Sequence, residues 1–166
     1  MSPQEKLSYL EETNQHVFHG SPDGTIKILE PRQSSHIPDI SKPDEIILDG
    51  KPAVAATPHA ELATFRAIIN GKNIPIKHNS GFGTTGGKTH FRVSSAEVLE
   101  HAKGKKGYVY VFDRKDFKPY DRERSENPRE GAMEWRAHTS VKPLEVIEVS
   151  SDDLPPTDKI EIGDKE

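Results

Sequence analysis

The sequence predicts an α+β fold that is built mainly from antiparallel β-sheet and contains few helices. Residues 59–70 carry Leu62, Phe65 and Ile69 at helical spacing, which makes this segment the best helix in the chain. Most strand-like segments follow this helix, and helices do not alternate regularly with strands. This order disfavours a doubly wound parallel sheet, in which the two alternate.

The first half of the chain is predicted to hold short elements that are separated by turns. Ser2 is a suitable cap for a helix, and Pro58 marks the end of a strand before the long helix. The predicted elements are, in order, a helix over 3–13, a strand at 17–18, a strand or extended run over 25–31, a polar loop over 32–51 and a buried strand over 52–57.

The second half is predicted to be richer in strands. Residues 107–112, GYVYVF, form the clearest strand because β-branched and aromatic residues follow one another without a break. The other predicted elements are a long loop over 71–90 with a short strand at 73–77, a strand at 91–94, a brief helix within 94–104, a charged loop over 113–131 and strands over 133–140 and 141–150. Residues 1–150 are thus expected to form a single domain, and the acidic tail over 151–166 is expected to be frayed.

Composition limits the class of protein. The chain has 166 residues and a formal net charge of -4, which fits one domain and weakly disfavours a dedicated nucleic-acid surface. It has no cysteine, no apolar run of the roughly 20 residues that a membrane helix needs, and no signal peptide at its start. We therefore expect no membrane association and a cytoplasmic location, and secretion without a cleavable signal stays open. The eight histidines show no compact ligand spacing, so no metal is predicted.

Residues 81–90, GFGTTGGKTH, are superficially similar to two nucleotide-binding motifs. The G-x-G-x-x-G fingerprint requires a strand before it and a helix after it, but here a strand-like segment follows. A P-loop ending in Gly87-Lys88-Thr89 requires glycine at position 82, which is Phe82. The sequence therefore favours a loop that is either mobile or in contact with substrate over a phosphate-binding loop.

Three segments in fixed order resemble the ADP-ribosyltransferase superfamily, although each residue alone has an ordinary structural explanation. They are VFHGS at 17–21, AVAATPHAELATF at 53–65 and AMEWRAHTSVKPLEVIEV at 132–149. A first strand ending in His-Gly, a second strand leading into a helix with an aromatic residue, and a late strand beginning with an acidic residue are similar to the poly-ADP-ribose polymerase branch. Gly-Tyr-x-Tyr at 107–110 and Pro143-Leu144 before a strand also resemble the small rifampin-modifying branch.

The resemblance implies split antiparallel sheets and an NAD-dependent transferase that cleaves the nicotinamide–ribose bond. Cleavage passes through a ribosyl cation, so the enzyme must hold the ribose, bind nicotinamide and place negative charge near the cation. By resemblance, the catalytic residues are His19 and Glu134, with Asp121 as the alternative acid. The implied NAD-binding residues are His19, Gly20, Ser21, Thr57, Phe65, Tyr108 and Tyr110.

The chain also departs from the family pattern. Many relatives carry a stacking tyrosine in the second strand, near Val54 here, unless Tyr108 or Tyr110 replaces it. The acceptor of ADP-ribose stays open between protein, nucleic acid and a small molecule, and so does the oligomeric state. Two alternatives are kept: a binding module that performs no chemistry, and transfer chemistry on a 2'-phosphorylated RNA end.

Overall fold

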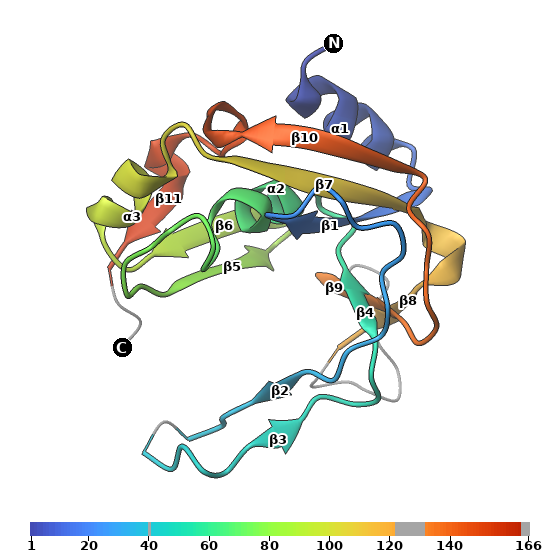
Figure 1. Cartoon of the computed structure of the whole chain (residues 1–166), viewed down its shortest axis with the longest axis horizontal. Helices are drawn as coiled ribbons and strands as arrows, with labels where there is room; N and C mark the ends of the chain where they lie inside the picture. The colour runs from blue at the N-terminus through green and yellow to red at the C-terminus, as the bar shows by residue number, and fades with distance from the viewer. Residues whose placement is uncertain (40, 122–131, 164–166) are drawn as a thin grey trace.

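The computed structural model describes residues 1–39, 41–121 and 132–163, and it confirms an α+β fold with mainly antiparallel sheets (Figure 1). The α-helices of this part are α1 (Pro3–Glu12), α2 (Ala60–Ile68) and α3 (Ala96–Ala102). Short 3₁₀ helices are η1 (Arg114–Asp116), η2 (Ser151–Asp153) and η3 (Thr157–Lys159). No helix in the described ranges is long and apolar enough to cross a membrane.

The central sheet has the strand order β1-β7-β10. Its strands are β1 (His16–Ser21), β7 (Lys106–Asp113) and β10 (Glu145–Ser150), all paired antiparallel. β7 is the middle strand and is covered on both faces, which explains its uninterrupted apolar sequence. Val109 and Val111 contribute to the core beneath α2, whereas Tyr110 and Phe112 contribute to a second core on the opposite face.

Helix α2 lies directly on the central sheet because two glycines leave room for it. A Cβ atom on Gly20 would lie 2.0 Å from the carbonyl oxygen of Ala63, and one on Gly107 would lie 2.1 Å from that of Ala67. Neither distance is possible for a real side chain, so both positions require glycine. The His-Gly pair in β1 therefore has a packing reason that is independent of any ligand.

A second sheet covers the opposite face of the central sheet. It has the order β4-β9-β8, with β4 (Val54–Ala56), β9 (Glu134–Ala137) and β8 (Lys118–Tyr120). Val54 and Trp135 pack in the second core. Backbone hydrogen bonds between Phe18 and Thr57, 2.7 and 2.9 Å long, join the edge strand β1 to the end of β4.

A third sheet replaces two segments that were predicted to be irregular. β5 (Ser80–Thr85) and β6 (Lys88–Val93) form a hairpin, so the prediction of a long loop over 71–90 is wrong for these residues. Gly86 and Gly87 both have positive φ, at 59° and 80°, as a two-residue hairpin turn requires. β11 (Ile160–Ile162) pairs parallel to β6, so the tail is not frayed over 151–163. Of the two alternatives for 25–31, no strand forms there apart from a single bridge between Leu29 and Val141. The predicted strand at 73–77 is absent, and β8 occupies part of the predicted charged loop.

A two-stranded arm extends from the rest of the molecule (Figure 1). It consists of β2 (Ser35–His36) and β3 (Ile47–Leu48), where the sequence predicts a loop. The arm exposes several large apolar side chains, namely Ile37, Ile46, Ile47 and Leu48. The base of the arm continues directly into β4, next to the site described below.

Candidate active site

A pocket of about 230 Å³ lies where β1, β4, β9 and α2 meet. It lies on the outer edge of β1, the side that does not pair with β7. The residues that line it are Phe18, His19, Gly20, Ala55, Ala56, Thr57, Leu62, Ala63, Arg66, Phe82, Met133 and Glu134. Four predicted site residues therefore converge here from distant parts of the chain, namely His19, Gly20, Thr57 and Glu134.

The backbone of Gly20 faces this pocket. Along an antiparallel strand, the N–H and C=O groups of successive residues point alternately to the two sides of the strand. In β1 and the residue before it, the C=O of Gln15 accepts from Arg114 on the side of β7, and Phe18 bonds Thr57 on the outer side. By the same alternation, the N–H and C=O of Gly20 point outward, beyond the last bond to β4. They form a donor and acceptor pair of the kind that recognises a planar carboxamide.

His19 is fixed in one tautomer by the strand beside it. Its Nδ1 lies 2.8 Å from the carbonyl oxygen of Ala55, which only accepts, so Nδ1 carries a proton. Burial lowers the pKa of His19 below its usual value, and the charge of Arg32 acts in the same direction, whereas the bond to Ala55 opposes both. In the neutral ring, Nε2 is then an acceptor for a ligand hydroxyl.

Glu134 begins β9 and is held by the residue two positions later on the same face of the strand. Nε of Arg136 donates a hydrogen bond to Oε2 of Glu134, and the glutamate side chain remains 35% exposed. Oε1 has no hydrogen-bond partner among the described residues. Glu134 therefore presents one held oxygen and one oxygen for a ligand.

The guanidinium of Arg136 is buried and fully engaged. Its terminal nitrogens donate to the carbonyl oxygen of Asp49 and to Oγ of Ser34, the latter at 3.2 Å. Its central carbon lies 3.5 Å from the centroid of the Tyr120 ring. Arg136 thus connects Glu134 to the base of the arm.

The wall formed by α2 and β5 adds a cation and an aromatic ring. Arg66 lies with its guanidinium carbon 4.8 Å from the ring centroid of Phe82. Its NH1 group is 3.4 Å from Oγ of Ser80. Burial lowers the pKa of Arg66 from its usual value.

Thr57 brings a hydroxyl to the pocket at the end of β4. Its Oγ1 accepts a hydrogen bond from the backbone N–H of His59 at 3.1 Å. The hydroxyl proton therefore remains for another acceptor.

Two predicted aromatic contacts need correction. Phe65 is fully buried in the core, with its ring 6.1 Å from that of Phe82 and 5.1 Å from that of Phe91, and it does not line the pocket. Phe82, and not Phe65, lines the pocket. Tyr110 is also buried, and its hydroxyl donates to the carbonyl oxygen of Asp23 at 2.5 Å.

Three further predicted residues lie outside the pocket. Tyr108 packs its ring over Gly24, and Oγ of Ser21 accepts from the N–H of Asp23 at 3.1 Å. Asp121, the alternative acid, is buried at the end of β8 and does not line the pocket. The geometry therefore favours Glu134 over Asp121.

The position at which the resemblance implies a stacking tyrosine, near Val54, shifts by one residue. Val54 points into the second core, whereas Ala55, the next residue, faces the pocket. The second strand thus offers a methyl group where a ring was expected, and Phe82 is the aromatic side chain among the lining residues besides Phe18 and His19.

Arg66 and Phe82 were missed by sequence reasoning, for different reasons. Arg66 is four residues after Leu62, and this helical spacing places both on the pocket side of α2. That signal was readable. Phe82 is in the glycine-rich hairpin, and nothing local in the sequence connects it with β1.

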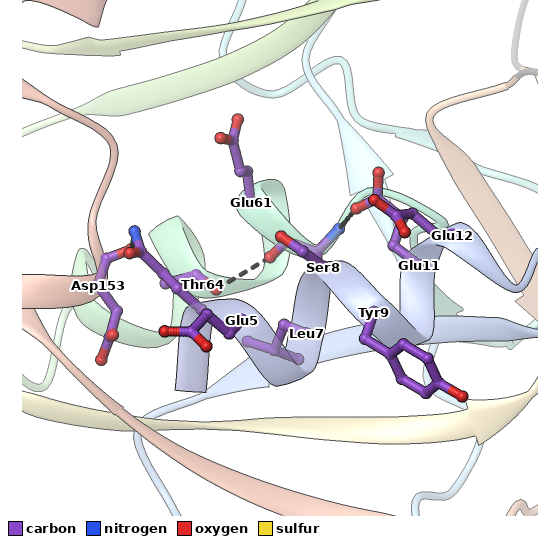
Figure 2. A pocket seen from close by; sticks show the side chains of 11 residues that line it. Glu5, Leu7, Ser8, Tyr9, Glu11, Glu12, Glu61, Thr64 and Asp153 are labelled. Carbon is purple, nitrogen blue, oxygen red and sulfur yellow. Dashed lines mark hydrogen bonds between the residues drawn. The ribbon is translucent and has the colours of Figure 1, made fainter. Parts of the chain in front are cut away.

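A larger groove of about 450 Å³ lies between α1 and α2 (Figure 2). Five of its eleven lining residues are acidic, and these include Glu5, Glu12 and Glu61. Glu11 has a structural role there, since its Oε1 accepts from the N–H of Ala60 at 2.7 Å and caps α2. None of its lining residues is Lys, Arg or His, so the groove offers no cation beside these acids and is the weaker candidate. No group of three or more metal-ligating side chains occurs in the described ranges.

No protein-family model, curated protein or solved structure matches this chain.

Proposed function

We propose that the chain is an NAD-dependent ADP-ribosyltransferase whose active site is the pocket between His19 and Glu134. The observation that carries the proposal is the convergence of these two side chains, from opposite ends of the sequence, with the outward backbone of Gly20 between β4 and α2. An imidazole acceptor, a carboxylate and a carboxamide-recognising strand edge are the groups that a nicotinamide riboside requires.

The chemistry follows from these groups. The C1'–N bond of NAD breaks, its electron pair neutralises the nicotinamide ring, and positive charge develops on the ribose. Nε2 of His19 accepts a hydrogen bond from a ribose hydroxyl, and Gly20 pairs with the nicotinamide carboxamide. Oε1 of Glu134 accepts from the other ribose hydroxyl and stabilises the developing cation. A nucleophile of the acceptor then bonds C1' and loses its proton.

The pocket, at about 230 Å³, is smaller than a typical small-molecule site, which measures about 300–1,000 Å³. It suits one end of the dinucleotide, so the adenosine end extends over the surface. This leaves the ribosyl carbon accessible to an acceptor, whose identity is determined outside the pocket.

The test is the release of nicotinamide from labelled NAD, because it requires no knowledge of the acceptor. Glu134→Gln is expected to reduce the rate by about 100-fold or more. Glu148→Gln is the matched control, since Glu148 is an exposed carboxylate on β10, outside the pocket. Equal rates for wild type and Glu134→Gln would remove Glu134 from the mechanism.

A second candidate function is a binding module that performs no chemistry. The methyl group of Ala55 at the site of the expected ring favours it, because one face of nicotinamide then has no aromatic partner from β4. This candidate predicts that NAD binds while nicotinamide release stays at the background rate.

A further inference from the structure

Arg66 is the one arginine among the lining residues of the pocket. It lies on α2 one turn after Leu62, and the two side chains border the same cavity as His19 and Glu134. Among the described residues, its side chain contacts the Ser80 hydroxyl, at the long distance of 3.4 Å, and the face of Phe82.

These contacts leave the charge of Arg66 without an anion. No carboxylate in the described part of the chain lies within ion-pair distance of it. A partly buried cation without a counter-ion is unfavourable unless something else supplies the negative charge. Arg136 shows the contrast, since it is more deeply buried and donates to Glu134, Asp49 and Ser34.

The pocket therefore has two electrostatically different sides. Arg66 on α2 offers an unpaired positive charge, and Glu134 on β9 offers a carboxylate oxygen. A ligand with an anionic group at one end and a centre of developing positive charge at the other matches this division. NAD and its mononucleotide have this distribution, with phosphate on the 5' side of the ribosyl carbon.

We propose that Arg66 binds the phosphate adjoining the nicotinamide ribose and so determines that the substrate is a 5'-phosphorylated nucleoside. This rests on the proposed function. The planar guanidinium of Arg66 donates two parallel hydrogen bonds to phosphate oxygens, a geometry that lysine does not reproduce. Phe82 supports the guanidinium from one face, so its orientation is set before the ligand binds.

The test is calorimetric titration of the 166-residue chain with NAD, nicotinamide mononucleotide and nicotinamide riboside. The Glu134→Gln background prevents consumption of the ligand. Adding Arg66→Gln is expected to weaken both phosphorylated ligands by about 10-fold or more and to leave the riboside within about 2-fold. Arg66→Lys is expected to restore only part of the loss. Arg114→Gln is the matched control, because Arg114 also stacks on an aromatic ring, that of Trp135 at 4.2 Å, away from this pocket.

Thermal unfolding of Arg66→Gln separates a binding role from a structural one. The midpoint is expected to change by no more than about 3 °C, since no protein carboxylate loses a partner. Unchanged affinity for NAD, or an equal loss for the riboside, would overturn the role of Arg66.

The outcomes also separate this inference from the proposed function. ADP-ribose, which lacks nicotinamide, is titrated in parallel. If the riboside fails to bind while ADP-ribose binds in an Arg66-dependent manner, the phosphate site stands and the nicotinamide site does not. If none of these ligands binds a folded protein, both proposals are overturned.

Discussion

Nε of Arg136 donates a hydrogen bond to Oε2 of Glu134, and the same guanidinium is tied to the base of the arm. The two residues differ in burial, with exposed side-chain fractions of 6% for Arg136 and 35% for Glu134. Removal of Glu134 and removal of Arg136 are therefore expected to cost different amounts of stability. Water can solvate Glu134 if Arg136 is lost, but it reaches Arg136 less easily if Glu134 is lost.

Replacement of Glu134 is expected to affect stability according to whether an acceptor is kept. Glu134→Ala leaves a buried N–H of Arg136 without its acceptor and is expected to lower the free energy of unfolding by about 1–3 kcal/mol. Glu134→Gln retains a carbonyl oxygen for that N–H and is expected to cost less. Urea unfolding of both variants measures the difference. Equal stability of the two would contradict the assigned role of Arg136 as the partner of Glu134.

Protonation of His19 is expected to make stability depend on pH. Its pKa in the folded protein lies below the ordinary value of 6.5, so the unfolded chain binds a proton more readily. Stability is then complete above about pH 6.5 and falls as pH drops toward the folded pKa. In His19→Asn, whose amide N–H can still donate to Ala55, this contribution is expected to disappear. Urea unfolding at pH 7.5 and pH 5 for both proteins tests it, and an identical loss in the two would exclude His19 as the source.

Gly20 and Gly107 are expected to tolerate alanine poorly, because α2 lies against both. Each substitution is expected to lower the free energy of unfolding by about 1–3 kcal/mol or more through overpacking. Gly20 also lines the pocket and Gly107 does not. Both variants lose apparent nicotinamide binding to the extent that they unfold. Only in Gly20→Ala is the folded protein itself expected to bind nicotinamide more weakly. Wild-type stability in either variant would show that the helix does not pack as closely as described.

Phe82 and Tyr110 are expected to differ in their effect on ligand binding. Phe82→Leu removes the aromatic wall of the pocket and is expected to weaken nicotinamide binding by about 2- to 10-fold. Tyr110→Phe removes only the hydroxyl that bonds Asp23 and is expected to leave binding unchanged. Fluorescence or calorimetric titration with nicotinamide measures both. A stronger effect from Tyr110→Phe would restore the sequence-based assignment of Tyr110 to the site.

Local sequence patterns were sufficient for the elements that carry their own signal. The helical spacing of Leu62 and Phe65 predicted α2, and the unbroken GYVYVF segment predicted β7. Gly86 and Gly87 form the two-residue turn of a hairpin, where the sequence-based prediction is a loop. Strand β11 gave no comparable signal, because three residues in an acidic tail become a strand only by pairing with β6.

For the candidate site, the sequence predicted which strands would supply His19 and Glu134, but not most of the residues around them. His19 and Glu134 were chosen by a resemblance, and the fold brings both to one pocket. Phe65 and Tyr110 were wrongly predicted to line the site, because the presence of an aromatic residue on a helix or strand does not show which face of that element is buried. That face depends on long-range packing of α2 and the second sheet, which a single sequence does not specify.

A crystal structure of the Glu134→Gln variant soaked with NAD tests the proposed site as a whole. We expect the nicotinamide carboxamide on the backbone of Gly20, the ribose between His19 and residue 134, and phosphate against Arg66. Nicotinamide density anywhere else, such as the acidic groove between α1 and α2, or an empty pocket at saturating NAD, would contradict it.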